Sequence, residues 1–141
     1  MSETPQPAQS EIAKAIIFHV SESPEITTKL TMEEVLDRSE TTRQIMSNVL
    51  GYLNPFFEGV VHDQVRYHVP DLRWGMICFD RQNRGISSIF VDKDGEYGYV
   101  NKQLVRFRIT DDGPSVAQRF QDIVDEIEAE LKRKASDPSA S

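Results

Sequence analysis

The stretch 74–109 constrains the fold of this chain most strongly, because it contains four strand signals separated by short turns. The four runs are rich in aromatic and β-branched residues and cover residues 74–79, 86–91, 96–100 and 104–109. Polar and glycine-containing segments at 80–85 and 92–95 have the composition of turns. Connections this short join antiparallel neighbours, so the sequence predicts an antiparallel β-meander.

The last of these strands predicts what covers the sheet. Its residues alternate, so that Val105 and Phe107 point to one face while Arg106 and Arg108 point to the other. The apolar face needs a cover, and the chain downstream offers a C-terminal amphipathic helix over residues 116–131. Its apolar residues recur at helical spacing: Val116, Phe120, Ile123, Val124, Ile127 and Leu131. We therefore expect an α+β fold with this helix packed on the sheet.

The N-terminal half is expected to be mainly helical. Good helix formers favour a first helix that starts near Ser10 and runs to Val20, although residues 15–20 are also compatible with a strand. A short strand is expected over 26–30. Thr31 and Glu34 then form a capping-box pattern that predicts a short helix.

Two more elements complete this half. A helix is expected from about residue 41 to residue 53, ended by Pro55, because apolar residues recur there at helical spacing. A tight hairpin is expected over 59–69. This order of helix, short strand, two helices and hairpin resembles the winged-helix family of helix-turn-helix domains over residues 11–69. The resemblance implies that the 41–53 helix is a recognition helix and that the 59–69 hairpin is a wing, in a family that mostly binds duplex DNA.

Length and charge limit the classes of function. The 141 residues fit one domain, expected over 11–134, with a winged-helix-like half at 11–69, the meander and helix at 70–134, and disordered tails at 1–10 and 135–141. The net charge of -7 is distributed as -5 over residues 1–60, +2 over 61–108 and -4 over 109–141. An acidic chain whose expected recognition helix offers only Arg43 as a cation disfavours nucleic-acid binding. The absence of a membrane-span pattern and of a signal-peptide pattern predicts a cytoplasmic protein.

Catalytic and metal-binding patterns are missing from the sequence. It contains no phosphate-binding glycine loop, no metalloprotease helix motif and no paired C-x-x-C. Cys78 lies within an apolar strand, where a core thiol is the simpler interpretation. His19, His62 and His68 do not have metal-ligand spacing. We expect no metal, no cofactor and no catalytic set, and we interpret 92–95 as a hairpin turn, because a calcium loop around it would need carboxylates at positions 90 and 101.

One set of residues is a candidate for binding a partner. Tyr97 and Tyr99 share a strand face, and Lys102, Arg106 and Arg108 can line the same face, where they would bind single-stranded nucleic acid or an acidic partner. Alternatively, the tyrosines pack under the C-terminal helix and the arginines are only solvated. The remaining candidate cations are Arg43, Arg66, Arg81 and Arg84.

Three functional hypotheses follow from these patterns. The first is a non-catalytic regulatory or adaptor module that binds another protein, as a monomer or as a homodimer. The alternative is a winged-helix DNA-binding transcriptional regulator. The third is a small enzyme with a site at the sheet edge, for which no nucleophile and base can be named.

Overall fold

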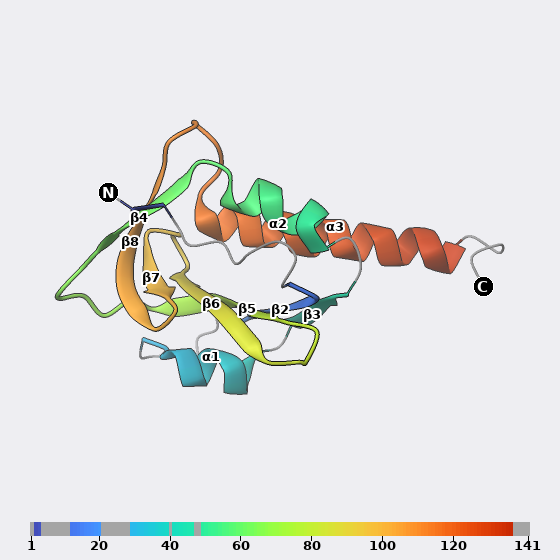
Figure 1. The fold of residues 1–141 in the computed structure, drawn as a ribbon, viewed down its shortest axis with the longest axis horizontal. Coiled ribbons are helices and arrows are strands. Elements are labelled where there is room, and N and C mark those ends of the chain that lie inside the picture. Colours follow the sequence, from blue (N-terminus) through green and yellow to red (C-terminus); the bar gives the residue numbers. More distant parts are fainter. Residues whose placement is uncertain (1, 4–11, 21–28, 40, 47–48, 137–141) are drawn as a thin grey trace.

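The strands form one antiparallel sheet, and helices pack on both of its faces (Figure 1). The computed structural model describes residues 2–3, 12–20, 29–39, 41–46 and 49–136. Within these residues the sheet has eight strands in the order β1-β4-β8-β7-β6-β5-β2-β3, with antiparallel pairing throughout. The strands are β1 (Ser2–Glu3), β2 (Lys14–His19), β3 (Thr41–Ile45), β4 (Val60–Gln64), β5 (Leu72–Phe79), β6 (Gly85–Asp92), β7 (Tyr97–Val100) and β8 (Gln103–Ile109). The helices are α1 (Met32–Arg38), α2 (Val49–Phe57) and α3 (Val116–Ser136). Figure 1 shows α2 and α3 on one face of the sheet and α1 on the other.

The predicted meander is confirmed. Strands β5, β6, β7 and β8 pair in sequence order, and Ile89 lies opposite Met76 on one side and Val100 on the other. The 92–95 segment is a hairpin turn as predicted, since the Gly95 amide donates to the Asp92 carbonyl at 3.1 Å. The α+β class is therefore confirmed.

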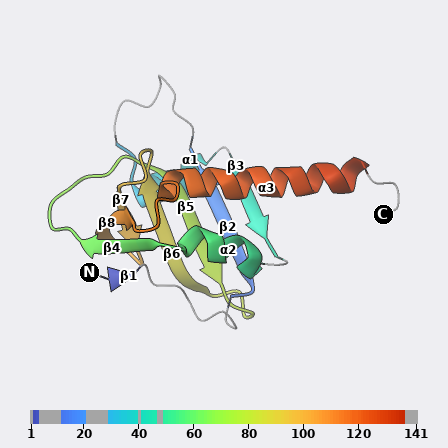
Figure 2. The same ribbon diagram turned by 90° about the horizontal axis from the view of Figure 1, so that it is seen from above.

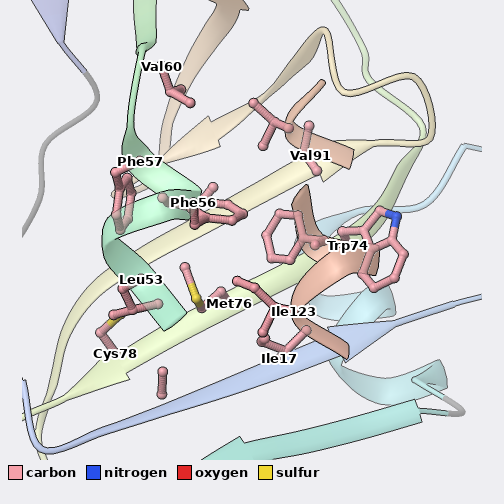
Figure 3. Packing of buried hydrophobic residues seen from close by; sticks show 14 of the residues in the cluster. Ile17, Leu53, Phe56, Phe57, Val60, Trp74, Met76, Cys78, Val91 and Ile123 are labelled. Carbon is pink, nitrogen blue, oxygen red and sulfur yellow. The ribbon is translucent and has the colours of Figure 1, made fainter. Parts of the chain in front are cut away.

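The main core lies between the sheet and the pair α2 and α3, as predicted for the C-terminal helix. Phe120 of α3 is fully buried and stacks on Trp74 of β5, with 5.5 Å between ring centroids. Phe56 of α2 meets the edge of the same phenylalanine ring at 4.8 Å. Val105 and Phe107 of β8 are buried in this cluster, which fits the predicted alternation. Figure 3 shows Phe56 of α2, Trp74 of β5 and Ile123 of α3 pointing into this core.

The helix expected from Ser10 to Val20 is wrong. Residues 14–19 form strand β2, which lies between β3 and β5, and residue 11 and those before it, apart from β1, lie outside the described residues. Ala15 and Ile17 face the main core, whereas Phe18 packs on the α1 side. Ile16 and Phe18 are partly buried on the other face, so the strand has a continuous apolar run, and its sequence looks like a short buried helix.

The recognition helix expected over 41–53 is also not observed. Residues 41–45 form β3, which pairs with β2, and α2 begins only at Val49. The β-branched residues at positions 41, 42 and 45 favour a strand over a helix. Pro55 does not end α2, because the helix continues to Phe57. Residues 47–48 lie outside the described residues.

The hairpin expected over 59–69 is replaced by a long-range pairing. Strand β4 pairs with β8 and with β1, so that Asp63 lies opposite Arg106, and residues 65–71 form no strand. Parts of the two predicted tails have regular structure, because Ser2–Glu3 form β1 and α3 extends to Ser136. The rest of the two predicted tails, residues 1, 4–10 and 137–141, lies outside the described residues. Of the strand expected at 26–30, residues 26–28 also lie outside them, and residues 29–30 are not in a strand.

Candidate functional site

Helix α1 covers only part of its face of the sheet. The Thr31 hydroxyl accepts from the Glu34 amide, and the Glu34 carboxylate accepts from the Thr31 amide, both at 3.2 Å, so the predicted capping box is confirmed. Val35 is fully buried against Leu72 and Phe90 in a second, smaller core. Helix α1 packs mainly on β5 and β2, and Val35 also reaches Phe90 of β6. No other described helix lies on this face, because α2 and α3 lie on the opposite one (Figure 1).

An open groove runs along the boundary between α1 and the sheet. Its volume is about 430 Å³. The apolar lining comes from Met32 and Leu36 of α1, and from Ile77 and Phe90 of the sheet. The polar lining includes Glu33, Ser88, Asn101 and Lys102. Leu36 is 40% exposed, so an apolar side chain of α1 faces water at the groove.

The sheet beside the groove brings four of the predicted site residues onto one face. Tyr97 lies opposite Arg106, and Tyr99 lies opposite Leu104 and beside Phe90. Because side chains alternate along a strand, Arg108 shares the face of Arg106. This is the face of α1, and Tyr99 packs against the smaller core there. The alternative in which the tyrosines pack under α3 is therefore wrong.

Asp92 fixes the start of β7 and so the place of Tyr97. Its carboxylate accepts from the Glu96 amide at 3.0 Å and from the Tyr97 amide at 3.3 Å. Burial raises the pKa of Asp92 above its ordinary value, and the backbone donors oppose that shift. The carboxylate is thus held inside the turn as an acceptor.

The charges on this face are largely paired with one another. Arg106 binds Glu96 at 2.9 Å, and its guanidinium lies 5.8 Å from the Tyr97 ring centroid. Arg108 binds Asp63 at 2.9 Å. His68 stacks on the Tyr97 ring at 3.8 Å. These contacts leave little positive charge and little ring surface for stacking a base.

The other predicted cations are not brought together with these four. Arg43 lies on the opposite face, where it binds Glu128 of α3 at 2.7 Å. Arg81 and Arg84 lie in the β5–β6 turn, and Arg84 binds Asp80 at 3.0 Å. Arg66 is exposed after β4, and Lys102 lines the groove from the β7–β8 turn.

Sequence reasoning missed two features of the α1 face. The segment between β4 and β5 exposes Tyr67 to 92% and also exposes Val69, while its His68 docks on Tyr97. The groove was missed as well, although α1 carries a signal for it. Met32, Val35 and Leu36 give this short helix more apolar side chains than its one buried position can accommodate.

The core thiol interpretation of Cys78 is confirmed. Cys78 is buried in the main core, on the side of the sheet away from the groove. Burial raises the pKa of its thiol to about 11, so the side chain stays protonated and is a poor nucleophile. Among the residues the structure describes, no group of three or more His, Cys, Asp or Glu side chains could hold a metal ion.

The fold and site together define an α+β protein with an open groove on one face of an antiparallel sheet. No protein-family model, no curated protein sequence and no solved structure matches this chain. None of the described helices is long and apolar enough to cross a membrane.

Proposed function

We propose that this chain is a non-catalytic regulatory or adaptor module that binds another protein through the groove between α1 and the sheet. The observation that supports the proposal is the 430 Å³ groove with an apolar floor and a partly exposed Leu36 at its wall. Grooves of this size with few polar groups are typical of binding sites. An apolar side chain of the partner is the expected anchor, because buried apolar anchors dominate the energy of protein interfaces.

Charged residues at the rim of the groove favour one orientation of a bound segment. Glu33 lies on the α1 wall and Lys102 on the sheet wall, so the two walls carry opposite charges. A partner segment with an acidic residue on one side of its apolar anchor and a basic residue on the other would match them. Rim charges of this kind set orientation more than affinity.

A selection experiment tests the proposed function. A displayed library of random peptides is panned on the protein and, in parallel, on Leu36→Glu, which places a charge at the groove wall. We expect enriched peptides that share an apolar anchor and bind Leu36→Glu about tenfold more weakly or worse. Leu131→Glu, at a similarly exposed leucine on α3, is the matched control and should bind like the parent protein. Enrichment that is equal on Leu36→Glu, or no enrichment, would contradict the proposal.

The DNA-binding alternative has less structural support. It needs a helix over 41–53 and a hairpin over 59–69, whereas those segments form β3, the start of α2 and a strand paired with β8. Its cations are spread over both faces, with Arg43 bound to Glu128. Fluorescence anisotropy with labelled duplex and single-stranded oligonucleotides separates the two proposals, since the groove proposal predicts no binding even at low salt.

A further inference from the structure

The C-terminal part of α3 extends past the edge of the sheet. Figure 2 shows the helix crossing the strands and continuing beyond β3, the last strand on that side. The ion pair between Arg43 of β3 and Glu128 marks where α3 passes over this edge. Residues 129–136 follow it, and eight helical residues span about 12 Å. This part of α3 therefore lies at the edge of the sheet, beside β3.

The apolar stripe of α3 continues into this overhanging end. Ile127 is buried, but Leu131, one turn later, is 56% exposed. Met46, just after β3, is 68% exposed. Both line a hollow of about 100 Å³ between β3, α2 and α3, together with Tyr52. Exposed apolar side chains gathered beside an edge strand are typical of a contact surface.

The charges beside Leu131 can pair between two copies, and Glu130 also binds Arg133 of its own helix at 2.9 Å. Glu130 and Lys134 are one turn apart on one flank of α3, and both line the hollow. When two copies of α3 pack antiparallel around Leu131, each flank meets the same flank of the other copy running in the opposite direction. Glu130 of each copy then approaches Lys134 of the other.

We propose that a second copy of this chain binds here, with the ends of the two α3 helices packed antiparallel and Leu131 of each against the other. A twofold axis near Leu131 makes the same patch serve both copies, as a symmetric dimer requires. The interface is separate from the groove under α1, which lies on the other face of the sheet. The dimer therefore does not depend on the groove binding a partner.

Analytical ultracentrifugation tests for the dimer directly. Between about 1 and 100 µM we expect the mass to rise from 16.1 kDa towards twice that value. Leu131→Glu should remain monomeric over this range. At about 1 µM, where the parent is also largely monomeric, the two should unfold thermally alike, because Leu131 is already largely exposed. Leu36→Glu should dimerise like the parent. A parent protein that stays monomeric, or a dimer that Leu131→Glu leaves intact, would overturn the proposal.

A charge exchange tests the antiparallel arrangement itself. Glu130→Lys places lysines against lysines in its homodimer, and Lys134→Glu places glutamates against glutamates, so each variant alone should dimerise about tenfold more weakly. An equimolar mixture restores both attractive pairs and should form heterodimers with parent-like affinity. A mixture that associates no better than the separate variants would exclude this arrangement and would point to a different protein as the occupant of the surface.

Discussion

At the scale of single residues, Arg119 binds together segments that are far apart in the sequence. Its side chain is 5% exposed. One guanidinium nitrogen donates to the carbonyls of Pro55, Phe56 and Glu58 at the end of α2, and Nε donates to the carbonyl of Pro114 at 2.9 Å. The last carbonyls of a helix have no partner within it, so Arg119 satisfies the end of α2 from α3.

Replacing Arg119 should therefore be costly. Arg119→Met keeps an apolar stem but leaves several half-buried carbonyls without a donor, and we expect a loss of about 3 kcal/mol in the free energy of unfolding. Urea denaturation at low protein concentration measures it. Arg133→Met, at an exposed arginine of the same helix, should cost about 0.5 kcal/mol or less. Equal losses in the two variants would show that Arg119 is not needed at the end of α2.

Gly98 allows β7 to lie close to β6. A Cβ atom at this position would meet the carbonyl oxygen of Phe90 well inside van der Waals contact. Gly98→Ala should push the two strands apart and lower the free energy of unfolding by at least about 2 kcal/mol. It should also displace Tyr97 and Tyr99. Urea denaturation measures the loss, with Gly85→Ala as the control, because a Cβ there finds ordinary contacts. A Gly98→Ala variant as stable as Gly85→Ala would contradict this explanation.

At the scale of elements, local sequence signals predicted most of the strands and helices correctly. The predictions for β2 and for the pairing of β4 were wrong. Strands β5 to β8 were predicted from their aromatic and β-branched residues and the turns between them, and β8 also from alternation. A capping box predicted α1 and helical spacing predicted α3, and all of these are local signals. Strand β2 is a short apolar run with one face buried and the other partly buried, so its sequence does not distinguish a strand from a helix. The predicted partner of β4 was wrong because its actual partner, β8, is distant in the sequence.

The candidate site shows the same division. Two-residue alternation predicted that Tyr97, Tyr99, Arg106 and Arg108 could share a face, and they do. Their ion pairs and the stacked His68 come from other strands and loops, and the register that creates them is not readable from local sequence. The groove depends on where α1 docks against β5, which is also a tertiary property.

The capping box of α1 should stabilise the wall of the groove. Thr31→Ala removes the acceptor for the Glu34 amide, and such caps are worth about 1 kcal/mol. We expect hydrogen exchange of the α1 amides to rise about fivefold while the amides of α3 are unchanged. Thr42→Ala, at an exposed threonine of β3, is the matched control. Unchanged exchange in α1 would mean that the sheet alone holds this helix in place.

Protonation of His62 of β4 should lower the stability of the fold at acidic pH. Burial lowers its pKa below the ordinary 6.5, and nearby Asp63 partly opposes the shift. His62 therefore takes up a proton more readily in the unfolded chain than in the folded one. Its contribution to folding stability is fully present above pH 6.5 and is lost as the pH falls through 6.5 towards the folded pKa. Urea midpoints between pH 7.5 and 5.5 should fall less for His62→Gln than for the parent. A parallel fall in both proteins would show that His62 carries no pH dependence.

At the scale of the whole molecule, the two proposed surfaces lie on different faces of one sheet. The groove lies between α1 and the sheet, and the dimer surface lies where α3 passes the edge at β3 (Figures 1 and 2). One copy could therefore hold a second copy and a protein partner at the same time. Paired substitutions at Leu36 and Leu131 can separate the two activities, because each residue is exposed on its own surface.

The most direct test of the central claim is to map where a selected peptide binds. Amide chemical shifts of the ¹⁵N-labelled protein are followed by NMR as the most enriched peptide from the panning is added. The groove proposal predicts that the largest shifts fall in residues 32–36, 85–88 and 101–102, and that Leu36→Glu abolishes them. Shifts concentrated at residues 43–46 and 127–134, or spread without pattern over both faces, would contradict the groove as the partner site.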